Sequence, residues 1–374
     1  MKSPITNCYN PKGTRPKLNA ETVHLYRPER EWTYSHHPHI TFFKGRFYAI
    51  WSNGRIHEDD VGQRILMSTA EDFQTWTEPE PLVDSLMGKH SELVLTAAGF
   101  HQHAGSLVAY FGQYEYTPES LENGTRRKGD TGHMDTGLRA VRTTDGHHWS
   151  SSIDMHLPIV PNHGPQKTTS GRLIISGNTV FPYTDDPSGL SGWNATGIYP
   201  PEMSAYVYDD SEYFWKVKEK MGWLVGLCEG AFYQTDDGVI YMLLRSNVDK
   251  LWVTESRDDG VTWSAPSETD FTDNATKFHF GRLPDGRFYY VGCPDPAPRG
   301  RRNPLVLSLS EDGVRFDRHF ILGDEEYEQE VPGMHKGGTY GYPHTMIRDE
   351  WLVVVFSICK EGVAVSRVRW DLVR

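Results

Sequence analysis

Histidine is concentrated where it could take part in acid–base chemistry. Of the 17 histidines, eight fall near the expected starts of inner strands in a repeated β-strand pattern. They are His36, His37, His39, His101, His103, His163, His279 and His344, and Glu229 and Tyr233 take the corresponding place in the fourth repeat. Imidazole titrates near neutral pH and serves as acid or base. The set predicts a cluster of titratable groups, although a single strand histidine is more often a hydrogen-bonded core residue.

Polar side chains also follow the second strand of each expected repeat. They are Asn53, Arg55, Tyr114, Tyr116, Asn178, Arg245, Asn247, Asp295 and Lys360. Because the two strands of a hairpin run antiparallel, the end of the second strand lies beside the start of the first. We therefore expect a funnel lined by imidazoles, amides, phenols and a few cations.

The residue types in this funnel favour β-elimination from a uronate. Ordinary glycosidases need two carboxylates beside the bond, and only Glu229 stands at an inner-strand start. Elimination needs a group that neutralises the sugar carboxylate, a base near pKa 7 and an acid for the leaving oxygen. Arg245 with Asn247 suits the carboxylate, and His103 and His163 suit the base and acid roles. The expected substrate-binding residues are His39, Asn53, Arg55, His101, Tyr114, Glu229, Tyr233, Asn247, His279 and His344.

Two weak patterns suggest a metal, although this chemistry requires no cofactor. His101 and His103 lie on the same side of a strand, which is a spacing used by metal ligands. Asp130, His133 and Asp135 form an oxygen-rich loop that could hold Ca²⁺. Packing and turn capping explain both patterns as well. A structural Ca²⁺ or other divalent metal in the central channel is thus an open expectation.

The elements that must position these side chains are short strands rich in β-branched and aromatic residues. Examples are the runs 46–51, 107–111, 172–176, 239–244, 287–291 and 351–356. Each follows a tight turn, and five of the six turns end in glycine, which supplies the positive φ of a hairpin turn. Repeats of about 50 to 70 residues made only of strands predict propeller blades. The segment Ser256–Trp263 also has the pattern S-x-D-x-G-x-x-W, with looser copies at 143–149 and 310–316.

Six blades are legible, and a seventh could lie within the irregular segment Asn178–Gly226. The run Thr22–Tyr26 could supply the fourth strand of the last blade and close the ring, which removes an exposed sheet edge. We therefore expect one all-β propeller domain over residues 1–374.

Composition excludes several classes of function. The chain has 374 residues, a net charge of -12 and no basic stripe, so a nucleic-acid partner is not expected. No run of about 18 apolar residues predicts a membrane span. Four cysteines without a C-x-x-C pair exclude a disulfide scaffold and a zinc ribbon. The first residues are polar and unlike a signal peptide, so we expect a cytoplasmic location, or a secreted or periplasmic one if a leader has been removed from this sequence.

Four segments resemble a family of sialidase-like propellers that act on L-rhamnose-α-1,4-D-glucuronate caps of arabinogalactan and gum arabic. They are Tyr34–Asn53, Asn162–Gln166, Phe278–Gly286 and Tyr340–His344. The family includes rhamnose-releasing lyases and α-L-rhamnosidases, and ulvan lyases are more distant relatives. The resemblance implies a seven-bladed propeller, a uronate-containing plant polysaccharide or oligosaccharide as partner, and a monomer. Some hydrolases of this group use a single histidine on the opposite face, where the turns at Gly45, Gly171 and Gly286 carry none.

Two alternatives to a lyase stay open. A sialidase-like hydrolase needs an arginine triad and a Tyr/Glu nucleophile pair. Arg245, Glu229 and Tyr233 are present, but the Phe/Tyr-Arg-Ile-Pro motif is absent. A non-catalytic glycan-binding propeller is the other alternative, because propellers often serve as platforms. Such a platform would not need so many titratable groups at one channel mouth.

Overall fold

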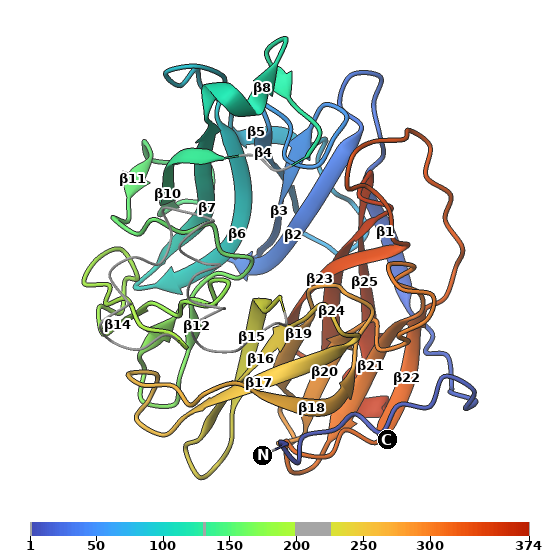
Figure 1. The fold of residues 1–374 in the computed structure, drawn as a ribbon. Helices are drawn as coiled ribbons and strands as arrows, with labels where there is room; N and C mark the ends of the chain where they lie inside the picture. The colour runs from blue at the N-terminus through green and yellow to red at the C-terminus, as the bar shows by residue number, and fades with distance from the viewer. Residues whose placement is uncertain (1, 130–131, 199–225, 374) are drawn as a thin grey trace.

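Antiparallel sheets arranged around a central axis make up the protein (Figure 1). The computed structural model describes residues 2–129, 132–198 and 226–373. Within these ranges six sheets surround the axis, five with four strands and one with three. The strands β2, β6, β15, β19 and β23 lie nearest the centre in Figure 1. The all-β propeller expected from the sequence is therefore confirmed at the level of architecture.

Each sheet is made of strands that are mostly consecutive in the chain. The first contains β2 (Tyr34–Phe43), β3 (Arg46–Gly54), β4 (Arg64–Ala70) and β5 (Glu80–Val83). The second contains β6 (Val94–His103), β7 (Ser106–Tyr116), β10 (His133–Thr143) and β11 (Ile153–Asp154). The third contains β12 (Gln166–Lys167), β13 (Leu173–Ile174) and β14 (Tyr183–Thr184). The fourth contains β15 (Cys228–Gln234), β16 (Ile240–Arg245), β17 (Lys250–Ser256) and β18 (Ser267–Thr272).

The last two sheets complete the ring. The fifth contains β19 (His279–Arg282), β20 (Phe288–Gly292), β21 (Leu305–Ser310) and β22 (Arg318–Gly323). The sixth contains β23 (Tyr340–Arg348), β24 (Trp351–Ile358), β25 (Gly362–Arg369) and β1 (Glu21–Tyr26). A small hairpin of β8 (Leu121–Glu122) and β9 (Thr125–Arg126) interrupts the loop between β7 and β10. Two short 3₁₀ helices are described, η1 (Pro118–Ser120) and η3 (Trp370–Leu372), and no described helix is long and apolar enough to cross a membrane.

The hairpin and Asp-box turns form as the sequence indicates. Gly45 and Gly286 have φ of +83° and +96°, which only glycine adopts without strain. In the box at 256–263, Asp258 Oδ1 accepts the Thr262 N–H at 2.8 Å and Ser256 Oγ accepts the Gly260 N–H at 2.8 Å. These bonds cap the turn within its own backbone, so they support the blade and leave the opposite end of the sheet free for chemistry.

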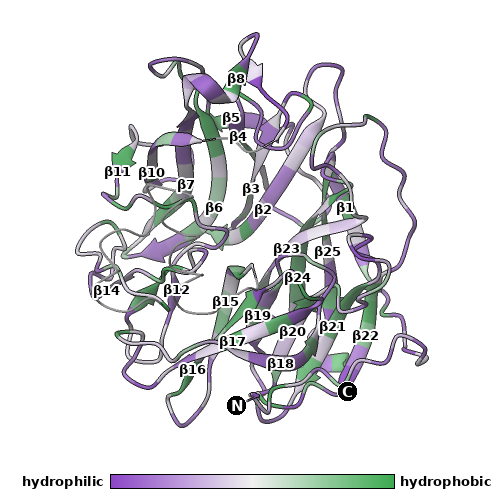
Figure 2. Cartoon of the chain, in the orientation of Figure 1, coloured by the Kyte–Doolittle hydropathy of each residue, from purple (hydrophilic) through white to green (hydrophobic). Residues whose placement is uncertain are grey.

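An apolar cluster fills the space between every two neighbouring sheets in the described ranges. The cluster between the third and fourth sheets, for example, joins Ile174 and Phe181 to Phe232 and Ile240. In Figure 2 the hydrophobic stretches lie mainly on the strands, which also carry hydrophilic residues, and many of the connecting loops are hydrophilic. Because sheets three and four contact each other directly, the ring of described sheets closes with six blades, one fewer than the resemblance implies. Residues 199–225 of the segment considered for a seventh blade lie outside the described residues.

The N-terminal strand closes the ring, as expected. β1 pairs antiparallel with β25, with Thr22 opposite Ser366 and Val23 opposite Val365. Leu25 is buried in the cluster between the sixth and first sheets. The last sheet therefore reaches four strands, with β1 at its outer edge, and the circular arrangement fixes the ends of the inner strands relative to one another.

Candidate active site

Three inner strands carry the same irregularity near their starts. In β2, His36 pairs with Ser52 and His39 pairs with Ile50, so the inner strand holds one extra residue between the two pairs. β15 and β23 carry the same insertion, between Cys228 and Ala231 and between Gly341 and His344. Bulges of this kind redirect side chains and recur beside active sites.

The residue after the first pair is left-handed in all three bulges. Its φ is +54° at His37, +50° at Glu229 and +49° at Tyr342. A non-glycine residue held in this region costs about 1–3 kcal/mol, and such residues cluster at functional sites. The three side chains meet, because the Tyr342 hydroxyl donates to Glu229 Oε1 and the Tyr342 ring lies 5.1 Å from that of His37.

Tyr342, Glu229 and Arg245 form one buried hydrogen-bonded group. Arg245 Nη1, at the end of β16, lies 2.6 Å from Glu229 Oε2 and 3.3 Å from the Tyr342 hydroxyl. Burial acts to raise the pKa of Glu229, but Arg245 and the Tyr342 hydroxyl hold it below its ordinary value. Burial and the Glu229 charge raise the pKa of the Tyr342 phenol well above its ordinary value. The pair therefore rests as a carboxylate and a neutral phenol, ready for proton transfer from phenol to carboxylate.

Further cations surround Tyr342. The Arg302 guanidinium carbon lies 5.7 Å from the centre of the Tyr342 ring, and its Nε and Nη1 are buried without a partner among the described residues. Lys277 Nζ lies 5.9 Å from the same ring centre and is buried and unpartnered too. Burial lowers the pKa of Lys277 to about 7. Because buried donors without partners are costly, this arrangement favours an anionic ligand.

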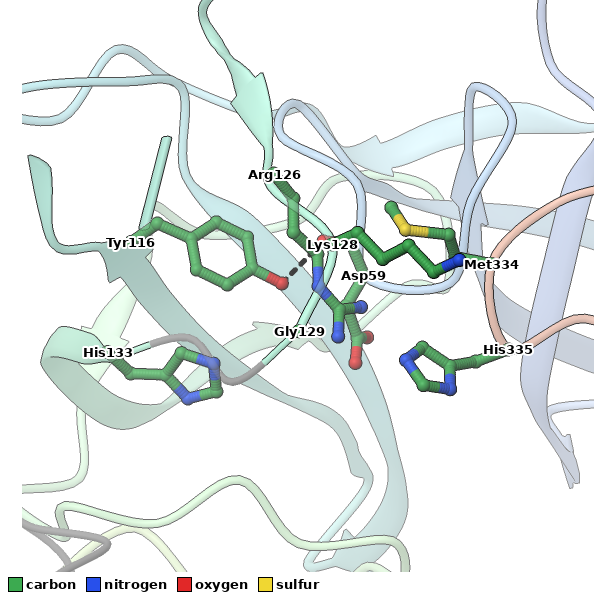
Figure 3. A pocket seen from close by; sticks show the side chains of 8 residues that line it. All are labelled: Asp59, Tyr116, Arg126, Lys128, Gly129, His133, Met334 and His335. Atoms are coloured by element: carbon green, nitrogen blue, oxygen red, sulfur yellow. Dashed lines mark hydrogen bonds between the residues drawn. The ribbon is translucent and has the colours of Figure 1, made fainter. Parts of the chain in front are cut away.

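A carboxyl group suited to act as an acid lines a cavity that is linked to this group through Glu58, whose charge acts on both Asp59 and Tyr342. Asp59 borders a cavity of about 610 Å³ formed by the loops β3–β4, β7–β10 and β22–β23 (Figure 3). The neighbouring Glu58 is ionised by Lys360, whose Nζ lies 2.6 Å from Glu58 Oε2. Burial and the Glu58 charge raise the pKa of Asp59 to about 6. Asp59 can therefore hold a proton near neutral pH, as a general acid must.

Four of the predicted histidines meet on the propeller axis. The ring of His344 lies 4.9 Å from that of His39 and 4.6 Å from that of His279, and His163 stacks on His279 at 5.3 Å. Burial, the nearby Lys277 and the other imidazoles lower the pKa of His39 and His163 well below the ordinary value. The predicted convergence is thus seen for these four residues, which form a neutral and buried group.

His101 and His103 do not lie with that group, contrary to expectation. β6 begins at Val94 and ends at His103, so both histidines stand at the hairpin end of the strand. His103 is exposed, and His101 Nε2 lies 2.8 Å from the Pro187 carbonyl oxygen. The base role that the sequence assigned to His103 in the funnel is therefore wrong. The hairpin face, whose turns at Gly45, Gly171 and Gly286 carry no histidine, has His101 and His103 instead. Tyr233 likewise lies near the hairpin end, where its hydroxyl donates to the Gly313 carbonyl.

The other predicted binding residues have structural partners or lie apart. Asn53 is fully buried and donates to the Tyr34 carbonyl at 3.2 Å. Arg55 forms an exposed ion pair with Glu92 at 3.1 Å, and Asn247 is exposed in the turn after β16. Tyr114 is buried under His133, with ring centres 4.1 Å apart. Asn53 therefore holds the site's framework, and Tyr114 supports the wall of the cavity.

Sequence reasoning missed Tyr342, Asp59 and Arg302. Tyr342 lies within the segment Tyr340–His344 that carries the resemblance, but the tyrosine chosen to pair with Glu229 was Tyr233. Asp59 belongs to an acidic run, which usually indicates a solvent-exposed surface, and Arg302 follows a loop with no strand pattern. A search for polar residues eight or nine positions before the last residue of each hairpin turn (Gly45, Gly238 and Glu350) would have found His37, Glu229 and Tyr342 together.

The donor groups fit a divalent metal poorly. Within the described ranges, only His36, His37 and Glu58 bring three ligand atoms within 4.8 Å of one another. Glu58 is bound by Lys360, and His36 Nδ1 lies 2.7 Å from Ser357 Oγ. The axial histidines offer no oxygen ligand for Ca²⁺ and have Lys277 beside them. In the loop proposed for Ca²⁺, Asp135 pairs with Lys89 at 2.9 Å, and Asp130 lies outside the described residues.

The chain belongs to the BNR repeat-like domain family, whose profile matches residues 45–354. It is similar to solved sialidases. One is titled "Sialidase" (TM-score 0.65, 18% identity, 94% of this chain and 33% of that chain), and another is the sialidase of Trypanosoma rangeli (TM-score 0.63, 12% identity, 93% and 59%). A protein of unknown function from Dyadobacter fermentans has a TM-score of 0.64 at 17% identity, and the match covers 93% of this chain and 98% of that protein.

These similarities establish the fold. This chain spans about a third of the length of the first sialidase and under two thirds of the Trypanosoma protein. Comparison with curated proteins finds no match. The chemistry of this protein must therefore be argued from its own side chains.

Proposed function

We propose that the protein is a glycan-processing enzyme that hydrolyses the glycosidic bond of an acidic sugar, with Tyr342 as nucleophile. The observation that carries this proposal is the hydrogen-bonded group of Tyr342, Glu229 and Arg245. Retaining glycosidases normally use a carboxylate nucleophile, and sialidases are the exception that uses tyrosine. A neutral phenol approaches an anomeric centre beside a sugar carboxylate with less repulsion than a carboxylate would.

Each group has a role in two balanced steps. Arg245 and Arg302 bind the sugar carboxylate through their guanidinium groups. Glu229 takes the phenol proton as the Tyr342 oxygen bonds to the anomeric carbon, and Asp59 gives its proton to the leaving oxygen as that bond breaks. In the second step the Asp59 carboxylate takes a proton from water, the water oxygen displaces the Tyr342 oxygen, and Glu229 returns the proton to the phenolate.

A structural relative supports the covalent step. One structure of the Trypanosoma rangeli sialidase is described as a covalent intermediate with 2,3-difluorosialic acid, and it has a TM-score of 0.63 with this chain. We extend that chemistry to this protein because the tyrosine and its carboxylate base are both present. The proposed reaction uses only the side chains named above.

A second candidate is β-elimination at a terminal L-rhamnose-α-1,4-D-glucuronate linkage of a plant polysaccharide. His37 favours it, because its ring lies 5.1 Å from Tyr342 and burial lowers its pKa to about 4, so it is a neutral base. Tyr342 would then protonate the leaving oxygen, and Arg302 would neutralise the uronate through the two nitrogens that have no partner among the described residues. His37 takes the role that sequence reasoning gave to His103. Under this candidate a monomeric enzyme would release the terminal rhamnose from chain ends.

Parallel assays on two substrates separate the candidates. With 4-methylumbelliferyl N-acetylneuraminide we expect fluorescence to increase, and incubation with 2,3-difluorosialic acid should add one sugar mass at Tyr342. With gum arabic, absorbance near 235 nm together with free L-rhamnose would establish elimination, and rhamnose alone would establish a rhamnosidase. Tyr342→Phe should lower turnover at least about 10³-fold on the active substrate.

Tyr110→Phe is the matched control. Tyr110 is also buried, but its hydroxyl donates to the Gly189 carbonyl at 2.9 Å, away from the site. This variant should retain turnover within a few fold. Undiminished turnover in Tyr342→Phe would refute both candidates, and no activity on either substrate would favour the binding platform.

A further inference from the structure

The cavity beside Asp59 has a wall that the proposed hydrolysis does not use. Arg126, Lys128, His133 and Tyr116 come from the loop between β7 and β10 and its flanking strands, and His335 faces them from the β22–β23 loop (Figure 3). At about 610 Å³, the cavity has the size of a small-ligand site. It can therefore hold a sugar residue.

Two positive charges lie on this wall, and the carboxylate that interacts with Arg126 is that of Asp59, which is neutral when protonated. Arg126 Nη1 donates to the Glu58 carbonyl at 2.9 Å, its Nε is buried without a partner, and neither Arg126 nor Lys128 forms an ion pair with a described residue. Glu58 itself is neutralised by Lys360. When Asp59 is protonated, the wall carries net positive charge, which favours an anion.

Aromatic rings lie beside these charges. His133 stacks on Tyr114 with centres 4.1 Å apart, and it lies 5.3 Å from the Tyr116 ring. Burial lowers the pKa of His133 to about 4, so its ring is neutral at pH 7. The Tyr116 hydroxyl donates to the Asp59 carbonyl at 2.8 Å, which ties the aromatic wall to the acid. Aromatic faces pack against the apolar face of a sugar while cations bind its acidic group.

We propose that this cavity is a leaving-group subsite for a sugar that carries a carboxylate or sulfate. The inference rests on the proposed function, because Asp59 protonates the leaving oxygen and so places the released sugar on its own side of the site. Arg126 and Lys128 bind the acidic group, and the Tyr116–His133 surface supports the ring. The natural substrate then carries acidic groups on both sides of the bond that is cut.

Binding of free sugars tests the subsite without turnover. D-glucuronate and D-glucose 6-sulfate would be titrated by calorimetry into the full chain at low salt, with D-glucose as the neutral control. We expect both anions to bind at least about tenfold more tightly than glucose, and added salt should weaken them. The anion that binds more tightly identifies carboxylate or sulfate as the natural group.

Variants assign that binding to the cavity. Arg126→Gln with Lys128→Gln should weaken anion binding about tenfold or more, and the exposed Lys128→Gln alone should give a smaller loss if Arg126 proves necessary for folding. Lys12→Gln with Arg30→Gln changes the same charge at exposed positions that do not line the cavity and should have no effect. Unchanged binding in the Arg126/Lys128 variant, or loss only in Arg245→Gln, would overturn the subsite.

The two proposals fail separately. Tyr342→Phe should bind the free anions as the wild type does, because it leaves the cavity wall intact. If Tyr342→Phe retains turnover while the Arg126/Lys128 variant loses binding, the proposed hydrolysis is wrong and the anion site stands. If Tyr342→Phe is inactive and the Arg126/Lys128 variant binds normally, the hydrolysis stands and the subsite is wrong.

Discussion

Arg245→Gln removes the cation that holds Glu229 ionised inside the propeller. The two side chains are largely buried, with exposed fractions of 22% and 11%, and Arg245 Nη1 lies 2.6 Å from Glu229 Oε2. Loss of one partner leaves a buried charge without compensation. The variant should therefore lose stability as well as turnover.

The size of this loss follows from the burial of the pair. Removing one partner of a buried ion pair typically costs about 3–5 kcal/mol. Because Tyr342 still donates to Glu229 and some water reaches both groups, we expect about 2–3 kcal/mol. An unfolding entropy of about 2.1 cal/mol/K per residue amounts to about 0.8 kcal/mol/K for the 374 residues, so this loss corresponds to a decrease in Tm of about 3–4 °C.

The loss of stability in Arg245→Gln should be larger at high pH than at low pH. In the wild type the pKa of Glu229 is lowered, so its stabilising contribution is present above the unfolded pKa and disappears as pH falls through the folded pKa. Without Arg245, burial should raise that pKa above the unfolded value of about 4.3, and ionisation then penalises folding above it. The stability difference between variant and wild type should shrink as the pH approaches 4.

Urea unfolding at pH 4.5 and pH 8 measures these differences. Glu229→Gln added to Arg245→Gln removes the stranded charge and should restore about 1–2 kcal/mol while turnover stays absent. An Arg245→Gln protein as stable as the wild type at pH 8 would refute the argument. So would a double variant that is no more stable than the single one.

Three further predictions concern other parts of the molecule. Activity should fall as pH rises through about 6, because Asp59, with its raised pKa, loses its proton there. Asp59→Asn should abolish this pH dependence. A wild-type activity that does not change across this pH range would exclude Asp59 as the acid. Lys277→Met should stabilise the protein more at pH 6 than at pH 10, since a lowered lysine pKa penalises the charged form below the unfolded pKa; thermal melts at both pH values test this. Leu25→Ala should reduce the unfolding free energy by about 2–4 kcal/mol by opening the cluster that closes the ring, with turnover at 25 °C retained; a loss below 1 kcal/mol would indicate that ring closure contributes little.

The fold could be predicted because its signals are local. A glycine after a short polar turn, followed by a strand of β-branched and aromatic residues, marks each hairpin, and Asp258 caps its box with bonds inside the turn. Ring closure by β1 could also be predicted from the last sheet, which lacked a strand. The six blades that repeat along the sequence match the six sheets that the structure describes, but the closure of the ring depends on contacts between distant strands, such as Ile174 with Phe232, which no local pattern reports.

The site was only partly predictable, because an inner strand has two ends with different roles. Distance from the hairpin turn decides the end: His39 stands five residues before Lys44, whereas His103 directly precedes Ala104. The bulges add a second difficulty. An inserted residue reverses the face of the strand on which each following side chain lies. A regular alternation of side chains between the two faces therefore does not predict the contact between Tyr342 and Glu229.

The pairing of β1 with β25 also has a consequence for synthesis on the ribosome. The two strands are separated by roughly 340 residues, which take on the order of 17–70 s to translate at 5–20 residues per second. During that time β1 has no partner, and the sixth sheet does not exist. A nascent chain therefore carries an unpaired strand edge throughout that time, and the ring can close only after the last sheet has been synthesised.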